Sequence, residues 1–571
     1  NELNKKYSKE VSDIVKSSGQ YPFITQTADG TIYVCYQEFK DRHDVIVAGV
    51  LTQEKGKFAE VTVISQEGEA LKPVCIADGN RVWYAWGECK NQKWGIYYRC
   101  YENGVYGEIK CAEEGEALFY PHLYAKNGKV YLMWNRQFSN AGEIVLANIT
   151  ENGIENVEVV SVSKEVYRPS MTITDDNTIY VAYDSFTGKN YDAIVRACRD
   201  GKWSDEKVVN SCRTSWSTQP LLASLKEKAL VCWYDFDHGS DFSYNSSVIS
   251  EKDGEVVVEE PCCIARGIDW YEDIALSENS KGEVAFSYSW GKTKLHVRRY
   301  DYKNKWADPI VFTYDEKSFA SNQSVLIDDE GTIHLAWQYG NENGHKPIRN
   351  AQVVYTWLRA EEYNEYIDME AEKVSDPFTR PIPAEKLLTR IGKEETKAWL
   401  KKNGYEGKTP VFGDIHGQSG TSDGVGEIDQ YFNVAKVWAN LDFLALTDHD
   451  SYPDWLTESE WEWIRTTSKL FNVKGEMATI LSYEWTPNEY RYDYGHKNIY
   501  YRGYEGEIFR CGDEGGMTPD RLFANLKKYR AMAFPHHPAA SWKLVSAATD
   551  WNFHDEEIQR LSLIHISEPT R

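Results

Sequence analysis

The sequence predicts a multidomain β plus α/β chain, with a seven-bladed β-propeller over residues 1–357 and part of a (β/α) barrel over residues 411–560. Three observations predict this division. A β-strand unit repeats about every 50 residues in the first part, an acidic and proline-rich stretch follows, and strands then alternate with helices around clustered histidines. The chain has 571 residues, of which 42% are hydrophobic, which is enough for buried cores.

The repeated unit predicts the blades of the propeller. Each copy has a short apolar strand, a turn rich in Asp, Asn and Gly, and an alternating strand that ends on an aromatic residue. Two more strands follow, which is typical of a four-stranded blade. Two of the seven copies, at 273–288 and 323–337, lack the initial proline. The other five begin at prolines that lie 48 or 51 residues apart, namely Pro22, Pro73, Pro121, Pro169 and Pro220.

The ring of blades has a predicted closure. The seventh copy shows a third strand at 350–357 but no clear fourth strand, and residues 10–16 stand in the register of a fourth strand before the first proline. We expect the beginning of the chain to complete the last blade, which removes a free sheet edge. We interpret the tryptophans at equivalent blade positions as packing residues; they are Trp86, Trp134, Trp233 and Trp337.

Charge and cysteine use restrict the partners and the compartment. The net charge is −24, so we expect neither nucleic acid nor an anionic membrane as the main partner. No apolar run approaches the ~20 residues that cross a bilayer. Most of the eleven cysteines lie inside apparent strands, which favours reduced thiols and a cytoplasmic location. The chain starts at Asn1, which leaves a removed signal peptide as the alternative.

Residues 358–410 are predicted to form a linker with short helices, and an α/β pattern follows them. Strands are expected at 411–416, 441–450, 477–485, 496–502 and 530–538, and helices at 427–440, 455–471 and 519–529. Buried strands that alternate with helices predict a parallel sheet or barrel. Histidines and carboxylates follow several of these strands, and polar residues at the carboxyl ends of barrel strands indicate the active face.

Four motifs of this second domain resemble the PHP (polymerase and histidinol phosphatase) superfamily of metal-dependent phosphoesterases. They are DIHGQSGTSDG, LTDHD, SYEWTP with GHKNIYY, and FPHHP. Residues 413–418 resemble in particular a poorly characterised branch with a GD-x-HGQ signature. The resemblance covers residues 411–560 and implies a distorted (β/α)7 barrel that holds two or three divalent ions of zinc, manganese or iron.

The resemblance also implies the residues of the site. The implied catalytic residues are His416, Asp423, His449 and Glu484. The implied metal ligands are His416, Gln418, Asp423, His449, Glu484, His496, His536 and His537, and the sequence leaves open which of the last two binds. Gln418 stands where the family has a histidine, and a neutral amide is a poor zinc ligand. The residues expected to orient these ligands from outside are Asp414, Asp448 and Asp450.

The expected function is hydrolysis of a small-molecule or carbohydrate-linked phosphoester by a metal-activated water, with the propeller as the recognition domain. The alternative is a non-catalytic protein whose propeller binds carbohydrate or protein beside a degenerate second domain. A third hypothesis is hydrolysis of a bond other than a phosphoester by the same ions.

The last eleven residues, LSLIHISEPTR at 561–571, resemble the translation of a sequencing-library adapter. We therefore expect a non-native tail and do not count His565 as a ligand. The superfamily's final Asp-x-His motif is expected beyond residue 560, so the resemblance predicts that this chain is truncated and inactive.

Overall fold

The computed structural model describes most of the chain and divides it into two compact units. The described residues are 8–10, 15–51, 58, 61–210, 216–237, 241–266, 273–290, 294–313, 320–340, 351–363, 393–451, 455–487, 494–537 and 548–559. The first unit comprises Asn1–Gly344, Arg349–Thr379 and Thr457–Glu462, and the second comprises His345–Ile348, Arg380–Leu456 and Trp463–Arg571. Most of the predicted linker (364–392) and the predicted tail (561–571) lie outside the described residues.

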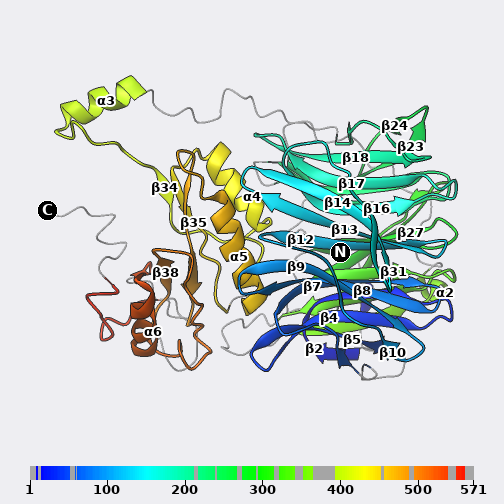
Figure 1. The fold of residues 1–571 in the computed structure, drawn as a ribbon, viewed down its shortest axis with the longest axis horizontal. Coiled ribbons are helices and arrows are strands. Elements are labelled where there is room, and N and C mark those ends of the chain that lie inside the picture. Colours follow the sequence, from blue (N-terminus) through cyan, green and yellow to red (C-terminus); the bar gives the residue numbers. More distant parts are fainter. Residues whose placement is uncertain are drawn as a thin grey trace. The chain divides into compact units, whose positions relative to one another are not determined.

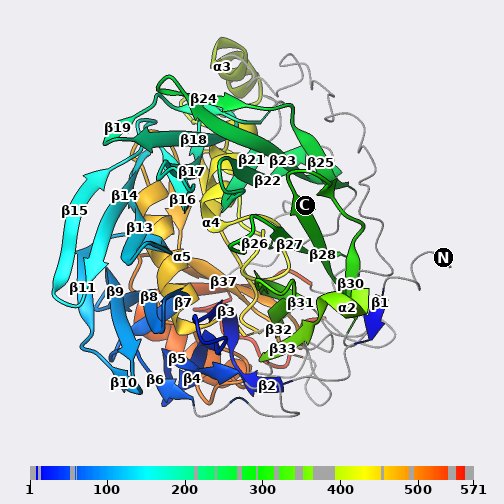
Figure 2. The same ribbon diagram turned by 90° about the vertical axis from the view of Figure 1, so that its right-hand side faces the viewer.

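Seven sheets of four to six strands make up the described part of the first unit (Figures 1 and 2), which confirms the predicted propeller. Blade one holds β3 (Gln20–Gln26), β4 (Ile32–Lys40), β5 (His43–Leu51) and β6 (Thr62–Val63). Blade two holds β7 (Glu69–Asp78), β8 (Arg81–Lys90), β9 (Lys93–Glu102), β10 (Val105–Tyr106) and β11 (Lys110–Gly115). Blade three holds β12 (Leu118–Lys126), β13 (Lys129–Phe138), β14 (Ala141–Thr150) and β15 (Gly153–Val159).

The other four blades repeat this order. Blade four holds β16 (Val166–Ile173), β17 (Ile179–Phe186), β18 (Tyr191–Arg199), β19 (Lys202–Trp203) and β20 (Lys207–Val208). Blade five holds β21 (Trp216–Ser224), β22 (Ala229–Asp237), β23 (Asp241–Lys252), β24 (Glu255–Val258) and β25 (Cys262–Arg266). Blade six holds β26 (Ile274–Glu278), β27 (Val284–Trp290), β28 (Lys294–Asp301), β29 (Lys305–Trp306), β30 (Ile310–Thr313) and β1 (Ser8–Glu10). Blade seven holds β31 (Ala320–Ile327), β32 (Ile333–Tyr339), β33 (Gln352–Leu358) and β2 (Val15–Ser18).

The ring of blades is closed. The first strand of each repeat contacts the first strand of the next, and β31 contacts β3, so these seven strands surround the centre seen in Figure 2. Strand β2 pairs antiparallel with β33, and the last blade therefore takes its outer strand from the beginning of the chain. Strand β1 pairs with β30 on the neighbouring blade, which ties the same segment to two blades.

A β-bulge explains the repeated prolines. In six of the seven innermost strands the register shifts at the proline or its equivalent. Proline has no N–H to give to a sheet, so it is tolerated where a bulge interrupts the pairing. The preceding residue is left-handed in each case, with φ between 43° and 56°; these residues are Tyr21, Lys72, Tyr120, Arg168, Gln219 and Asn322.

The cores of the blades account for much of the aromatic content. The four tryptophans at equivalent positions are each at most 1% exposed, which confirms that they are packing residues; they are Trp86, Trp134, Trp233 and Trp337. Each lies on the second strand of its blade. Their rings fill space between adjacent sheets, as expected for a propeller whose blades pack face to face.

The second unit contains two three-stranded sheets among its described residues, and no barrel is formed there. Strands β34 (Gly413–Asp414), β35 (Phe443–Ala445) and β36 (Ala478–Ile480) are parallel. Strands β37 (Ser482–Trp485), β38 (Lys497–Tyr501) and β39 (Ala531–Pro535) are antiparallel. The predicted (β/α) barrel is therefore wrong for the described residues. Parallel neighbours need a crossover of a dozen or more residues, and the connection from β37 to β38 is shorter than that.

The helices lie near their predicted positions. Helix α4 (Ile428–Asn433) continues into the π-helical turn η2 (Val434–Trp438). The other helices are α2 (Ala360–Tyr363), α3 (Lys393–Lys402), α5 (Glu458–Phe471), α6 (Pro519–Leu526) and the 3-10 turn η3 (Lys527–Tyr529). Each helix in the described ranges is too short or too polar to span a bilayer.

Candidate functional site

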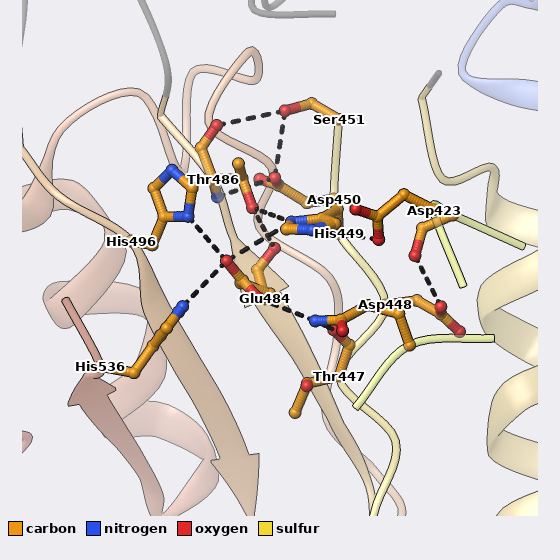
Figure 3. A network of polar contacts seen from close by, with 12 residues as sticks. Asp423, Thr447, Asp448, His449, Asp450, Ser451, Glu484, Thr486, His496 and His536 are labelled. Atoms are coloured by element: carbon orange, nitrogen blue, oxygen red, sulfur yellow. Dashed lines mark hydrogen bonds and ion pairs between the residues drawn. The ribbon is translucent and has the colours of Figure 1, made fainter. Parts of the chain in front are cut away.

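Glu484 lies at the centre of a cluster of histidines in the second unit (Figure 3). Its side chain is 1% exposed. His496 Nδ1 lies 2.8 Å and His536 Nε2 3.1 Å from Glu484 Oε1. His416 Nε2 lies 3.3 Å from Oε2, and His449 Nδ1 lies 3.4 Å from Oε1. Four imidazoles thus converge on one buried carboxylate.

The ends of neighbouring strands bring these side chains together. Glu484 is on β37, which pairs with β38, and His496 directly precedes β38. His536 follows β39, whose last residue pairs with the first residue of β38. His449 forms an isolated parallel bridge with Glu484 beyond the end of β35. Residues far apart in sequence are therefore adjacent, because the ends of β37 and β39 and the beginning of β38 lie at one edge.

The cluster contains one carboxyl with a lowered pKa, Glu484, and one imidazole with a raised pKa, His449. Burial alone would raise the pKa of the Glu484 carboxyl, but the charge of His449 and the close polar contacts with His416, His496 and His536 hold it well below its usual value. Burial would lower the pKa of His449, yet the carboxylates of Glu484 and Asp423 raise it to about 9. At neutral pH the site thus holds a carboxylate beside a protonated imidazole.

Three further rings, those of His496, His536 and His537, are neutral at neutral pH. Burial lowers the pKa of His496 and of His536. Burial, together with the neighbouring rings of His536 and His496, lowers the pKa of His537 to about 4. A neutral imidazole keeps a lone pair on one ring nitrogen, which is the state that binds metal ions.

The donor set fits a divalent transition-metal ion. The ligand atoms of His416, Glu484 and His536 lie within 4.8 Å of one another, as do those of His496, His536 and His537. The His536 ring is 2% exposed, and neither of its nitrogens makes a hydrogen bond of normal geometry, although Nε2 points at Glu484. Imidazole and carboxylate ligands suit Zn²⁺, Mn²⁺ and Fe²⁺.

Asp423 reaches the cluster from a glycine-rich loop that Asp448 holds in place. Asp423 Oδ1 lies 3.4 Å from His449 Nε2. The buried Asp448 carboxylate accepts the Ser419 N–H and three hydroxyl groups, at 2.6 to 2.7 Å; the hydroxyls are those of Ser419, Thr421 and Ser422. Asp448 was expected to orient His449, but the structure shows that its carboxylate anchors the loop before Asp423.

The other predicted residues have different neighbours. The Gln418 side-chain amide donates to Glu484 Oε2 at 3.0 Å and to the Thr447 carbonyl at 3.2 Å. These two acceptors orient the NH₂ group of Gln418 toward the cluster. Gln418 therefore acts as a hydrogen-bond donor to Glu484. Asp414 is exposed and accepts the backbone N–H of His416 at 2.9 Å.

Two threonines were missed by sequence reasoning. Thr486 Oγ1 lies 2.7 Å from His449 Nδ1, and Thr447 Oγ1 accepts the Gly417 N–H at 3.1 Å. Thr486 stands two residues after Glu484, and alternate residues of a strand share a face. That spacing was a usable signal. The sequence offered no signal for Thr447, because its hydroxyl contacts the backbone of Gly417.

Comparison with known proteins gives only remote likenesses. No family model matches the chain, and no curated protein matches it. The chain is similar to a protein of unknown function from Dyadobacter fermentans DSM 18053, with a TM-score of 0.37 and 10% identity over 62% of this chain and 98% of that chain. It is similar to a Trypanosoma rangeli sialidase, with a TM-score of 0.33 and 9% identity over 63% and 60%. It is also similar to an endo-arabinase from Bacteroides thetaiotaomicron VPI-5482, with a TM-score of 0.28 and 14% identity over 42% and 96%.

These findings correct the family assignment made from the sequence. The assignment of residues 411–560 to the PHP superfamily is wrong: no family model matches the chain. The sheet-rich architecture, without the expected barrel in the described residues, agrees with this correction. The predicted PHP-type phosphoesterase activity and its phosphoester substrate are therefore withdrawn, together with the inactivity inferred from a missing family motif.

Proposed function

We propose that this chain is a propeller-based binding protein whose second unit holds a divalent transition-metal ion at the Glu484 cluster. The observation that carries the proposal is the convergence of four imidazoles on one buried carboxylate at 2.8 to 3.4 Å. A buried charge of this kind needs compensation. Protonated His449 supplies it in the metal-free fold, and a cation bound by Glu484 and the neutral rings of His496 and His536 would supply it in the loaded site.

The two carboxylate oxygens face different histidines. Oε2 faces His416, whereas Oε1 faces His496 and His536. This division suits either one ion or a pair of ions bridged by Glu484. We propose zinc, manganese or iron as the occupant, because these ions accept mixed nitrogen and oxygen ligands.

The test is metal retention by the whole chain and by matched histidine variants. Dialysis against zinc, manganese or iron(II), followed by elemental analysis, is expected to leave at least one ion per wild-type chain. His536→Ala is expected to lose it, whereas His334→Ala is expected to keep it, because the buried His334 lies in the propeller and bonds Tyr355. A wild-type chain without metal, or equal loss in both variants, would contradict the proposal.

For the propeller we propose a carbohydrate ligand at the end of the ring that carries the left-handed bulge residues. Residues of adjacent blades meet there: Lys72 Nζ lies 5.1 Å from the Tyr21 ring, and the Arg168 guanidinium lies 5.8 Å from the Tyr120 ring. Gln219 and Asn322 add half-buried amides. Aromatic faces beside amides and the Lys72 ammonium suit a polyhydroxylated ligand, whereas the Arg168 guanidinium is buried in an ion pair with Asp184.

A glycan array with the purified chain tests this ligand class. Tyr120→Ala is expected to weaken any positive signal at least about ten-fold, as loss of an aromatic anchor does. Phe138→Ala, which removes an exposed aromatic from the end of β13, is expected to leave it unchanged. Binding that survives Tyr120→Ala, or no glycan binding at all, would exclude a carbohydrate site at this end.

Hydrolysis of a bond other than a phosphoester is the second candidate function. The cluster is reachable on one side, where the side chains of His416 and Asp423 are 36% and 29% exposed while Glu484 is 1% exposed. A bound divalent ion lowers the pKa of its water toward ~7. Turnover of carboxylic esters or glycosides by the metal-loaded chain, absent from Glu484→Gln, is the expected result; a complete lack of turnover would leave binding as the function.

A further inference from the structure

We propose that Thr486 fixes the tautomer of His449, so that Nδ1 carries the ring proton and Nε2 is the atom presented to the metal. This inference rests on the proposed metal-binding function, and it concerns the ring nitrogen of His449 that faces Asp423, not the one that faces Glu484. His449 Nδ1 lies 2.7 Å from Thr486 Oγ1, and Thr486 is 2% exposed (Figure 3). Water therefore has little access to this contact.

The direction of the hydrogen bond follows from the other neighbour of the hydroxyl group. Thr486 Oγ1 lies 3.2 Å from the backbone carbonyl oxygen of Glu484, which can only accept. The single hydroxyl proton of Thr486 is therefore directed to that carbonyl. The hydroxyl oxygen must then accept from His449, so Nδ1 has to carry a proton. Glu484 Oε1, 3.4 Å from Nδ1, is a further acceptor on the same side of the ring.

Asp450 holds Thr486 in the position that this hydrogen bond needs. The backbone N–H of Thr486 donates to Asp450 Oδ1 at 2.9 Å, and the backbone N–H of Cys511 donates to Oδ2 at 2.7 Å. Asp450 is fully buried. The sequence predicted that Asp450 orients His449, and in the structure it does so through Thr486.

The other side of the His449 ring faces a carboxylate. Nε2 lies 3.4 Å from Asp423 Oδ1. When Nδ1 holds the only ring proton, Nε2 presents a lone pair to an oxygen that also has only lone pairs, and such a pair needs a proton or a cation between its members. Two ligand atoms bound at ~2.1 Å to a tetrahedral ion are ~3.4 Å apart. The spacing therefore suits one metal ion shared by His449 and Asp423.

Two substitutions at one position separate the hydrogen bond from packing. Thr486→Val keeps the shape but removes the acceptor, and Thr486→Ser keeps the hydroxyl. We expect Thr486→Val to weaken zinc binding by about 10–100-fold, which is the usual effect of losing a residue that hydrogen-bonds a metal ligand. The zinc affinity of Thr486→Ser is expected to stay within about three-fold of the wild type, since serine keeps the hydroxyl oxygen that accepts from His449. Near-ultraviolet circular dichroism checks that both variants fold.

The tautomer itself is read from two-bond ¹H–¹⁵N spectra of the histidine rings, recorded on metal-free protein at a pH where the His449 ring is neutral. We expect the proton on Nδ1 in the wild type and in Thr486→Ser, and a mixture or the Nε2 form in Thr486→Val. A proton on Nε2 in the wild type, or a Thr486→Val variant that binds zinc as tightly as the wild type, overturns the inference. If neither the wild type nor either variant binds zinc, but the wild type carries the proton on Nδ1, the proposed metal site is wrong and the tautomer assignment stands.

Discussion

The histidines of the two units have different surroundings. In the propeller, His122 accepts the Met171 N–H, and burial lowers its pKa to about 4. His334 on another blade bonds the Tyr355 hydroxyl. In the second unit, four imidazoles face the single carboxylate of Glu484. The propeller disperses its histidines, whereas the second unit brings them together.

The difference teaches that burial alone does not indicate a functional histidine. A buried imidazole that stays neutral and finds one hydrogen-bond partner is a satisfied core residue. A buried carboxylate surrounded by imidazoles, one of them with its pKa raised to about 9, keeps charge in a place where charge is costly. The substitutions below test whether stability resides in the first unit and metal affinity in the second.

The largest expected effect is on the stability of the propeller. Trp233 is 1% exposed, packs in a core of blades four and five, and donates to Asp235 at 3.1 Å. Trp233→Ala is expected to lower the free energy of unfolding by about 3–5 kcal/mol, as measured by urea denaturation. Zinc affinity, measured below the transition, is expected to stay unchanged. A parallel fall in zinc affinity would show that the metal site depends on the propeller core.

The next effect concerns the centre of the cluster. Glu484→Gln keeps the size of the side chain but removes its charge. We expect zinc affinity to fall by more than about 100-fold, which is the upper end for loss of a residue that only supports a ligand, because Glu484 is itself a proposed ligand. Calorimetric titration measures this change. Glu514→Gln is the matched control, since its side chain is 90% exposed. Equal affinities in the two variants would remove Glu484 from the site.

The pH dependence of binding tests the electrostatics of the cluster. In the metal-free fold the pKa of His449 is raised from 6.5 to about 9, so its extra proton is fully bound below about 6.5 and is lost as the pH rises through about 9. Zinc has to displace that proton. Affinity is therefore expected to rise about ten-fold per pH unit between pH 7 and 9 and then level off. An affinity independent of pH over this range would contradict a protonated His449.

The smallest effect is expected from the loop anchor. Asp448→Asn removes one of the two oxygens that together hold four donors of the loop before Asp423. We expect about ten-fold weaker zinc binding, because Asp423 becomes less well positioned. Asp520→Asn serves as the exposed control. Identical titration curves for both variants would show that Asp423 does not depend on this anchor.

Sequence reasoning recovered the propeller because its signals are local and repeated. Each copy carries its own alternation and turn, and five of the seven carry the proline, so seven weak patterns support one another. Sequence reasoning also named the histidines that surround Glu484, from their places in the four motifs. In the structure His416, His449 and His536 follow β34, β35 and β39, whereas His496 precedes β38. The barrel was wrong because strand direction depends on connections and pairing partners. The run at 477–485, for example, looks continuous but divides at Leu481 between a parallel and an antiparallel sheet.

The supporting residues of the site were harder to predict. Asp448 and Asp450 flank His449 in sequence, which suggested that both orient its ring. In the structure Asp448 anchors a loop, and Asp450 acts through Thr486. Adjacent residues of an extended segment point to opposite sides, so neighbours in sequence need not be neighbours in space. Only the folded geometry separates these roles.

The most direct test of the metal site is anomalous X-ray scattering from zinc-soaked crystals of the chain, recorded on both sides of the zinc absorption edge. We predict a strong peak within about 2.0–2.2 Å of ligand atoms of Glu484 and its histidines, and none at the half-buried His122 or the buried His334 of the propeller. A clear map of the Glu484 cluster without a peak, or zinc found only at exposed histidines such as His43, would contradict a metal-binding second unit.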